Sequence, residues 1–317
     1  MKRTKNPAKE AEYRKRAADL VAQMTLHEKV SQMLSWAPAI ERLGIPAYNW
    51  WSEGIHGVGR AGTATVFPQA IGMAAAFDED MMEQVGNAVG VEARGKYNMC
   101  RAHGDRDIFK GLTVWAPNIN IFRDPRWGRG HETYGEDPFL TSRLGVRFVE
   151  GMQGDDPDYL QAAACAKHFA VHSGPESDRH HFNAIVSKQD LWETYLPAFR
   201  ALVKEAGVEA VMGAYNRTNG EPCCGSKTLL KDILRDKWHF DGHVTSDCWA
   251  IKDFHTGHMV TDGPVESVAL AVNNGCDLNC GDLYVYLEQA VAEGKLSEEK
   301  IDESLTRLYA VSYTHLT

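Results

Sequence analysis

Short apolar runs alternate with longer amphipathic segments along this chain, and this alternation restricts the fold more than any other feature of the sequence. The runs have the length and composition of buried strands, and they occupy residues 113–116, 162–171, 210–214, 243–246 and 276–278. Helical patterns lie between them, at residues 79–96, 138–152, 188–205, 226–236 and 264–273. Strands and helices in alternation predict a parallel sheet that is covered by helices.

The number of strand–helix repeats favours a closed barrel over an open, doubly wound sheet. No G-x-G-x-x-G motif follows any of the apolar runs, so a dinucleotide-binding sheet has no support. The 317 residues leave room for a barrel, which commonly takes about 250 residues. We therefore predict an α/β fold with one (β/α)8 TIM-type barrel.

Composition excludes some partners. The chain has 34 basic and 43 acidic side chains, a formal net charge of −9, so no attraction for nucleic acid is expected. The first twenty residues are charged and contain no apolar run, so they form neither a secretory signal nor a membrane span. We expect a cytoplasmic protein without membrane contact, or a periplasmic or secreted one if residues precede the given start.

The seven cysteines are an odd number in a large chain, and several lie in apolar stretches, which predicts reduced thiols rather than disulfides. Three sets of residues could be drawn as metal ligands, namely Cys223 with Cys224, Cys276 with Cys280, and His172 with His180 and His181. None of them has the spacing of a zinc site. We expect no metal and no other cofactor.

The segments that follow the apolar runs are rich in charged, hydroxyl and aromatic side chains. In a barrel these segments form the face where chemistry takes place. Asp247 follows the run at residues 243–246, and a carboxylate at that place can attack an electrophilic carbon and form a covalent intermediate. The alternative is that Asp247 only caps a helix, which is the better interpretation of a lone Ser-Asp pair.

Four hydrogen-bond donors cluster on three of these segments, namely Arg129, Lys167, His168 and Arg179. Together they could hold several hydroxyl groups, and their positive field is expected to keep a neighbouring carboxylate ionised. Four tryptophans lie near the same segments and could stack on a sugar, namely Trp50, Trp51, Trp127 and Trp249. Salt bridges for the cations and core packing for the indoles are the alternatives for any one of these residues.

Six segments in the same order resemble the amino-terminal barrel of family 3 glycoside hydrolases. They read WWSEGIHG from Trp50, FPQAIGMAAAFD from Phe67, APNINIFRDPRWGRGHETYGEDP from Ala116, CAKHFAVHSGPESDR from Cys165, GAYNRTNGEPCC from Gly213 and TSDCWAI from Thr245. The resemblance covers residues 17–311, after a charged N-terminal extension at residues 1–16, and it implies a barrel that cleaves glycosidic bonds.

The resemblance also implies a role for particular residues. Asp247 matches the nucleophile of a retaining, double-displacement mechanism. The positions that line the sugar subsite beside the scissile bond match Glu53, Arg129, Lys167, His168, Arg179, Tyr215 and Trp249. Members of the family also carry a non-proline cis peptide bond at the Lys-His pair.

The substrate implied by the resemblance is a terminal β-D-xylosyl group of a plant oligosaccharide. Glu53 after two tryptophans, Ser-Asp-Cys at the nucleophile and the CDLNCG segment look like the branch of β-xylosidases and α-L-arabinofuranosidases. A longer side chain at Glu53 would fill the space that a hexose hydroxymethyl group needs. Lost volume discriminates by only about 1–3 kcal/mol, so β-D-glucosides remain an alternative substrate.

A retaining enzyme also needs an acid/base carboxyl, which most of this family place in a second α/β domain after the barrel. We expect that group to lie outside this chain, and we interpret residues 312–317 as a possible non-native tail. One alternative is a single-domain β-N-acetylhexosaminidase-like enzyme with a dyad of Asp178 and His180; another is a sugar-binding barrel with little turnover. A barrel without its partner domain exposes apolar surface, which predicts self-association into a homo-oligomer.

Overall fold

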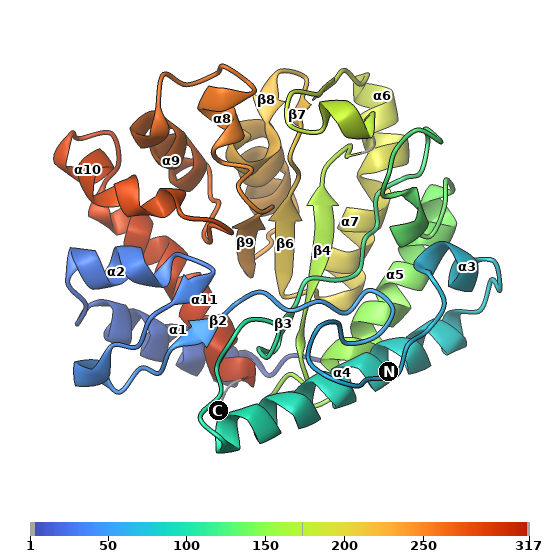
Figure 1. The fold of residues 1–317 in the computed structure, drawn as a ribbon, viewed down its shortest axis with the longest axis horizontal. Helices are drawn as coiled ribbons and strands as arrows, with labels where there is room; N and C mark the ends of the chain where they lie inside the picture. Colours follow the sequence, from blue (N-terminus) through green and yellow to red (C-terminus); the bar gives the residue numbers. More distant parts are fainter. Residues whose placement is uncertain (1–3, 173, 316–317) are drawn as a thin grey trace.

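The computed structural model describes residues 4–172 and 174–315, and its centre is a parallel sheet of four strands (Figure 1). The strands lie in the order β3 (Thr113–Val114), β4 (Ala163–Phe169), β6 (Ala210–Gly213) and β9 (His243–Ser246). Every residue of these strands is buried. In Figure 1 the arrows of β4 and β6 point up, toward the segments that carry α8 (Asp253–Thr256), β7 (Arg217–Thr218) and β8 (Glu221–Pro222).

Isolated bridges and one short hairpin continue this sheet into a ring. Beyond β9, Leu278 pairs with Thr245, and Asn279 pairs in parallel with Leu34. The chain from Leu34 leads into β1 (Trp36–Ala37), which pairs with β2 (Tyr48–Asn49), and Ser52 then pairs with Val114 of β3. The predicted α/β barrel is confirmed. Its described wall is less regular than eight parallel strands, because the β1–β2 pair is antiparallel.

Most predicted elements are found near their expected bounds. The predicted helices at residues 79–96, 138–152 and 264–273 correspond to α4 (Glu79–Ala102), α5 (Pro138–Gln153) and α9 (Pro264–Asn273). Asp78 and Asp137 cap α4 and α5 by accepting from the backbone N–H groups of Met81 and Leu140. The predicted strand at residues 276–278 is only an isolated bridge. The Cys276 carbonyl accepts from the Tyr284 hydroxyl at 2.6 Å, and the Val244 backbone N–H donates to the Asp277 side chain at 2.8 Å.

Two predicted helices have a different geometry. Residues 188–205 divide into α6 (Lys188–Asp190), η4 (Leu191–Tyr195), α7 (Pro197–Ala201) and η5 (Leu202–Ala206), in which η4 and η5 are π-helical. Pro197 has no backbone N–H, so it interrupts the hydrogen bonding of the helix. The segment at 226–236 forms the π-helical η7 (Lys227–Lys237).

The first and last long helices lie beside each other. In α1 (Pro7–Val21), Tyr13 is buried, and its ring stacks on Tyr313 of α11 (Glu298–His315) with 6.3 Å between centroids. The expected boundary between the N-terminal extension and the barrel, at residues 16 and 17, falls inside α1. Residues 312–315 of the expected non-native tail continue the helix α11. Residues 316–317 of that tail lie outside the described residues.

The remaining elements are short. They are α2 (Leu26–Gln32), η1 (Glu41–Leu43), α3 (Ala70–Ala74), η2 (Gly130–Glu132), η3 (Glu176–Asp178), β5 (Asn183–Ala184), η6 (Cys223–Gly225), η8 (Leu283–Tyr286) and α10 (Leu287–Ala292). Among the helices of the described residues, none has the length and apolar character needed to cross a bilayer.

Candidate functional site

Asp247 lies directly after β9, at the carboxyl end of the ring. It is 7% exposed, and its Oδ1 accepts the backbone N–H of Cys248 at 2.8 Å. Its Oδ2 has no hydrogen-bond partner among the described residues. That oxygen lies 3.8 Å from Nη1 of Arg129 and 3.5 Å from Nε2 of His168. The bond to Cys248 resembles that of a capping residue, but the free oxygen faces the groups that the sequence placed at the barrel mouth.

The electrostatic balance at Asp247 differs from the expectation that nearby cations dominate. Burial raises the pKa of the Asp247 carboxyl, and Arg129 and Lys167 oppose that rise without cancelling it. Desolvation of a carboxylate with one unsatisfied oxygen is therefore the larger effect. The pKa is raised above the ordinary range of aspartate.

His168 is held by Asn120 in a single orientation. The Asn120 amide accepts from the His168 backbone N–H at 2.8 Å and donates to the His168 carbonyl at 2.8 Å, and its Oδ1 lies 3.0 Å from Nδ1. Because an amide oxygen only accepts, the hydrogen-bond network assigns the ring proton to Nδ1. Burial and the charge of Arg129 hold the pKa of His168 well below its usual value, so the ring is neutral. The expected cis peptide bond between Lys167 and His168 is present.

Two acceptors therefore face each other at the centre of the site. Nε2 of neutral His168 carries a lone pair, and 3.5 Å away Oδ2 of Asp247 carries another; neither has a donor among the described residues. Buried acceptors without partners are costly. A hydroxyl group from a ligand could donate to either atom, so this pair is suited to a polyhydroxylated ligand.

Arg129 is oriented by Glu132, a residue that the sequence reasoning missed. Nε and Nη2 of Arg129 donate to the two Glu132 oxygens at 2.7 and 2.8 Å. Burial disfavours a charge on Glu132, but Arg129 outweighs it and lowers the pKa of Glu132 to about 2. The i, i+3 spacing of Arg129 and Glu132 in η2 was a readable signal for this pair.

Glu53 and Lys167 form a second polar group at the mouth. Nζ of the buried Lys167 lies 3.8 Å from Oε2 of Glu53, while Oε1 of Glu53 accepts from Nε1 of Trp51 at 2.7 Å. Trp51 in turn stacks on Trp115 with 5.6 Å between centroids. Glu53 is thus fixed from two sides.

Tyr215 and Arg179 complete the set. The Arg179 guanidinium lies 5.5 Å from the centroid of the Tyr215 ring and pairs with Glu176. Burial and the negative charge of Asp247 raise the pKa of Tyr215 well above its usual value. The structure therefore brings together Glu53, Arg129, Lys167, His168, Arg179, Tyr215 and Asp247.

The four tryptophans differ in exposure and surroundings. Trp249 is 51% exposed beside Asp247, so its ring is free to meet a ligand. Trp50 is buried in the hydrophobic core. Trp127 is buried outside the core cluster, with its ring 5.4 Å from that of His172. Trp51 is half-buried and supports Glu53, as described above.

The alternative dyad of Asp178 and His180 is wrong. Nδ1 of His180 lies 2.8 Å from Oδ2 of Asp253, while Asp178 approaches His181 instead, at 3.9 Å. Burial raises the pKa of Asp253 against the opposing effect of His180. Asp253 belongs to α8, which the sequence did not place near His180 because the two are separated by 73 residues. The ring of His180 lies 5.0 Å from that of Tyr215, at the edge of the site.

The expectation of only reduced cysteines is also wrong, because Cys248 and Cys280 form a disulfide. The two residues lie in the segments after β9 and after Leu278, whose pairing with Thr245 brings them together. Cys100, Cys165, Cys223, Cys224 and Cys276 are free. The three histidines considered as metal ligands do not converge, and in the described part of the chain no three His, Cys, Asp or Glu residues are grouped as a metal site.

The fold and site define an α/β barrel with a buried carboxylate and a set of charged and hydrogen-bonding side chains at the carboxyl ends of its strands. Residues 16–311 match the family model described as glycosyl hydrolase family 3 N terminal domain, and the chain belongs to that family. A xylan 1,4-beta-xylosidase of Xylanibacter ruminicola is 49% identical over 93% of this chain and 35% of its own length. A probable beta-D-xylosidase 7 of Arabidopsis thaliana is 44% identical over 94% of this chain and 40% of its own.

Solved structures agree with this assignment. A GH3 exo-beta-xylosidase (XlnD), in complex with a xylobiose aziridine activity-based probe, matches with a TM-score of 0.88 and 34% identity over 95% of this chain and 40% of its own. A β-glucosidase of Erythrobacter marinus matches with a TM-score of 0.82 and 30% identity over 95% of this chain and 45% of its own. The chain thus spans less than half the length of these relatives.

Proposed function

We propose that this chain provides the nucleophile and the sugar-binding groups of a retaining, exo-acting β-glycosidase. The observation that carries the proposal is the pair of unpartnered acceptors, Oδ2 of Asp247 and Nε2 of His168, beside the Arg129 guanidinium. Oδ2 of Asp247 attacks the anomeric carbon, the bond from that carbon to the leaving oxygen breaks, and a glycosyl-aspartate forms. Water then releases the sugar and restores the carboxylate.

The proposed substrate is a terminal β-D-xylosyl group of a small plant oligosaccharide. Similar proteins named xylosidases support this choice, as does Glu53, which Trp51 and Lys167 hold at the mouth. A β-xylosidase/α-L-arabinofuranosidase 2 of Medicago sativa, 40% identical, and the β-glucosidase structures keep arabinofuranosides and glucosides as further substrates.

The acid/base group is proposed to come from outside residues 1–317. His180 lies at the edge of the site, 5.0 Å from the Tyr215 ring, but its Nδ1 is engaged by Asp253. A sugar-binding barrel with little turnover remains the second function, and it differs from the first because it forms no glycosyl-aspartate.

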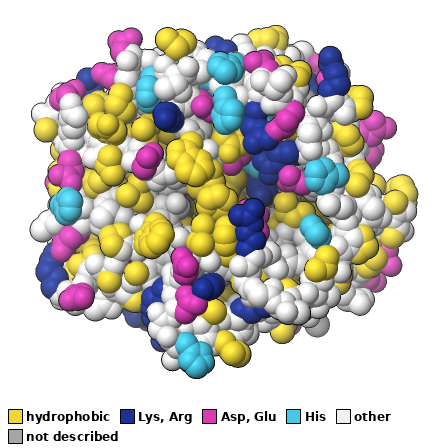
Figure 2. Space-filling view, viewed as in Figure 1, with side chains coloured by type: hydrophobic (Ala, Val, Ile, Leu, Met, Phe, Trp, Pro, Cys, Tyr) yellow, Lys and Arg dark blue, Asp and Glu magenta, His cyan; other side chains and the backbone are white. Residues whose placement is uncertain are grey.

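Apart from its sugar substrate, the proposed partner is a second copy of this chain, with no role for nucleic acid or membrane. Large apolar side chains are exposed in the segments that follow β9, namely Trp249, Met259, Val260, Val285 and Tyr286. Figure 2 shows hydrophobic side chains gathered near the middle of the face it displays, interrupted by Lys and Arg. Because disulfides are rare in the cytoplasm, the Cys248–Cys280 disulfide favours the periplasmic or secreted location over the cytoplasmic one.

Trapping of the glycosyl-aspartate tests the proposed chemistry. A 2-fluoro xyloside with a good leaving group needs no acid, so it should add one sugar mass to the peptide that contains Asp247. Asp247→Asn should abolish the label. Asp253→Asn, which alters another buried carboxyl in the same region, should leave the labelled position unchanged. A wild-type protein that binds xylose but gains no mass at this peptide would leave only the sugar-binding function.

The choice of xyloside over glucoside has its own test. Glu53→Asp shortens the side chain beside Lys167 by one methylene group. The ratio of the labelling rate with the 2-fluoro glucoside to that with the 2-fluoro xyloside should therefore rise about tenfold, which is within the range of discrimination that one methylene gives. An unchanged ratio of the two labelling rates would show that Glu53 does not set the choice.

A further inference from the structure

A cavity of about 350 Å³ lies at the end of the barrel opposite Asp247. Tyr48, one of its lining residues, accepts the backbone N–H of Leu112 just before β3, at 2.9 Å. The ring of Trp50, another lining residue, lies 5.3 Å from His243, the first residue of β9. Asp247 follows the last residue of β9, so the length of that strand separates this cavity from the sugar site.

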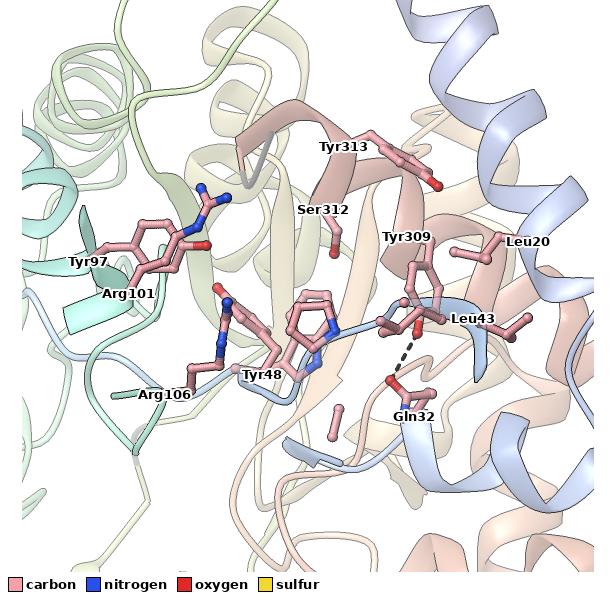
Figure 3. Close-up of a pocket in the computed structure, with 15 residues that line it drawn as sticks. Leu20, Gln32, Leu43, Tyr48, Tyr97, Arg101, Arg106, Tyr309, Ser312 and Tyr313 are labelled. Carbon is pink, nitrogen blue, oxygen red and sulfur yellow. Dashed lines mark hydrogen bonds between the residues drawn. The ribbon is translucent and has the colours of Figure 1, made fainter. Parts of the chain in front are cut away.

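One side of the cavity is cationic. Arg101, from the last turn of α4, and Arg106, from the segment after it, both line the cavity. Figure 3 shows them on one side, with Leu20 and Leu43 on the other. Neither arginine is engaged in an ion pair or hydrogen bond with another described residue, and no acidic side chain is among the residues that line the cavity. Two guanidinium groups without a counter-ion favour an anionic ligand.

The walls of the cavity are aromatic and aliphatic. The rings of Tyr48 and Trp50 meet edge to face with 5.1 Å between centroids, and Tyr97 of α4 adds a third ring. Leu43 and Ile45 contribute aliphatic surface. A cavity of this volume, lined by rings, accommodates a planar group of about the size of one benzene ring with a short side chain.

We propose that this cavity binds a small aromatic carboxylate, with its ring against Tyr48 and Trp50 and its carboxylate at Arg101 and Arg106. The anionic group satisfies the unpaired guanidinium groups, and the ring removes apolar surface from water. The site is independent of the proposed glycosidase chemistry, because it shares no lining residue with the sugar site.

Fluorine NMR titration of the full chain with 4-fluorocinnamate tests this site. We expect saturable binding with a Kd on the order of 1 mM or tighter. The uncharged 4-fluorocinnamamide keeps the ring and should bind about tenfold more weakly, as should 4-fluorocinnamate to the double variant Arg101→Gln/Arg106→Gln. Arg200→Gln removes an exposed arginine of α7 and should change nothing.

Leu43→Trp fills the cavity without altering its charge, so it should block binding of 4-fluorocinnamate while the thermal unfolding midpoint shows that the chain still folds. Saturating xylose should not displace the ligand. Displacement by xylose, equal affinity for acid and amide, or unchanged affinity in the double arginine variant would each overturn the proposal. None of these outcomes bears on the labelling of Asp247.

Discussion

The Asp247 carboxyl is subject to two opposing effects, burial and the charges of Arg129 and Lys167. As the proposed nucleophile, Asp247 must be ionised. Because its pKa is raised, the rate of labelling by a 2-fluoro xyloside should fall as the pH drops through that raised pKa. Arg129→Gln removes the cation 3.8 Å from Oδ2 of Asp247 and should raise the pKa of that carboxyl further. The acidic limb of the plot of labelling rate against pH should therefore move to higher pH. The measurement is the inactivation rate constant as a function of pH.

Arg126→Gln is the matched control for that experiment. Arg126 lies in the same segment, but it is exposed and pairs with Asp124. The acidic limb of the plot of labelling rate against pH should be the same for Arg126→Gln as for the wild-type protein. An acidic limb of Arg129→Gln at the wild-type pH or below it would show that Arg129 does not act on the charge of Asp247.

Individual site residues could be predicted from sequence when a strand end positions them. Lys167, His168 and Asp247 follow or end buried runs, so their convergence at one face follows from the barrel. The partners that orient them could not be predicted in this way. Asn120 and Asp253 act from other segments, 48 and 73 residues away from the histidines they contact, and no local pattern encodes such distances.

At the scale of elements, α4 and α5 cross at glycines. A Cβ added to Gly86 of α4 would lie 2.2 Å from the carbonyl oxygen of Phe148 in α5, whereas a Cβ at Gly95 of the same helix would meet nothing within 4 Å. Gly86→Ala should therefore lower the free energy of unfolding by about 1–3 kcal/mol or more, because backbone must move. Gly95→Ala should raise it by about 0.5–1 kcal/mol through helix propensity.

Urea denaturation of the two variants measures this difference. The pair controls for composition, since each adds one methyl group to α4. Equal stabilities for Gly86→Ala and Gly95→Ala would mean that the two helices are not in the close contact described.

The Cys248–Cys280 disulfide connects two neighbouring segments at the barrel mouth. A thiol reagent applied to the unfolded, unreduced chain should modify five of the seven cysteines, because Cys100, Cys165, Cys223, Cys224 and Cys276 are free. After reduction it should modify all seven. Mass spectrometry gives the count, and seven modified cysteines before reduction would contradict the disulfide.

Some helices and strands could be predicted from the local sequence pattern, and others could not. The buried runs at β4, β6 and β9 and the capped helices α4 and α5 are strong local signals. The antiparallel β1–β2 pair is two residues per strand, too short for alternation to be visible. The π-helical turns in η4 and η5 share the apolar spacing of an α-helix, so periodicity alone could not reveal them.

At the scale of the whole molecule, the large apolar side chains that are exposed in the segments after β9 predict self-association. Light scattering after size-exclusion chromatography should give a multiple of the 35.3 kDa chain mass at high concentration. Met259→Ser/Val285→Ser should shift the equilibrium toward the single chain, since both side chains are exposed by more than half. The double variant Phe139→Ser/Ile185→Ser removes exposed apolar groups elsewhere and should leave it unchanged. A mass of one chain at every concentration would contradict this prediction.

The packing of α1 on α11 has a consequence for how the chain folds during synthesis. Tyr13, Ala17 and Val21 of α1 are buried in the finished barrel, but α11 leaves the ribosome long after α1. At about 5–20 residues per second, that interval lasts tens of seconds. For all of it the apolar face of α1 is open to chaperones and to other nascent chains.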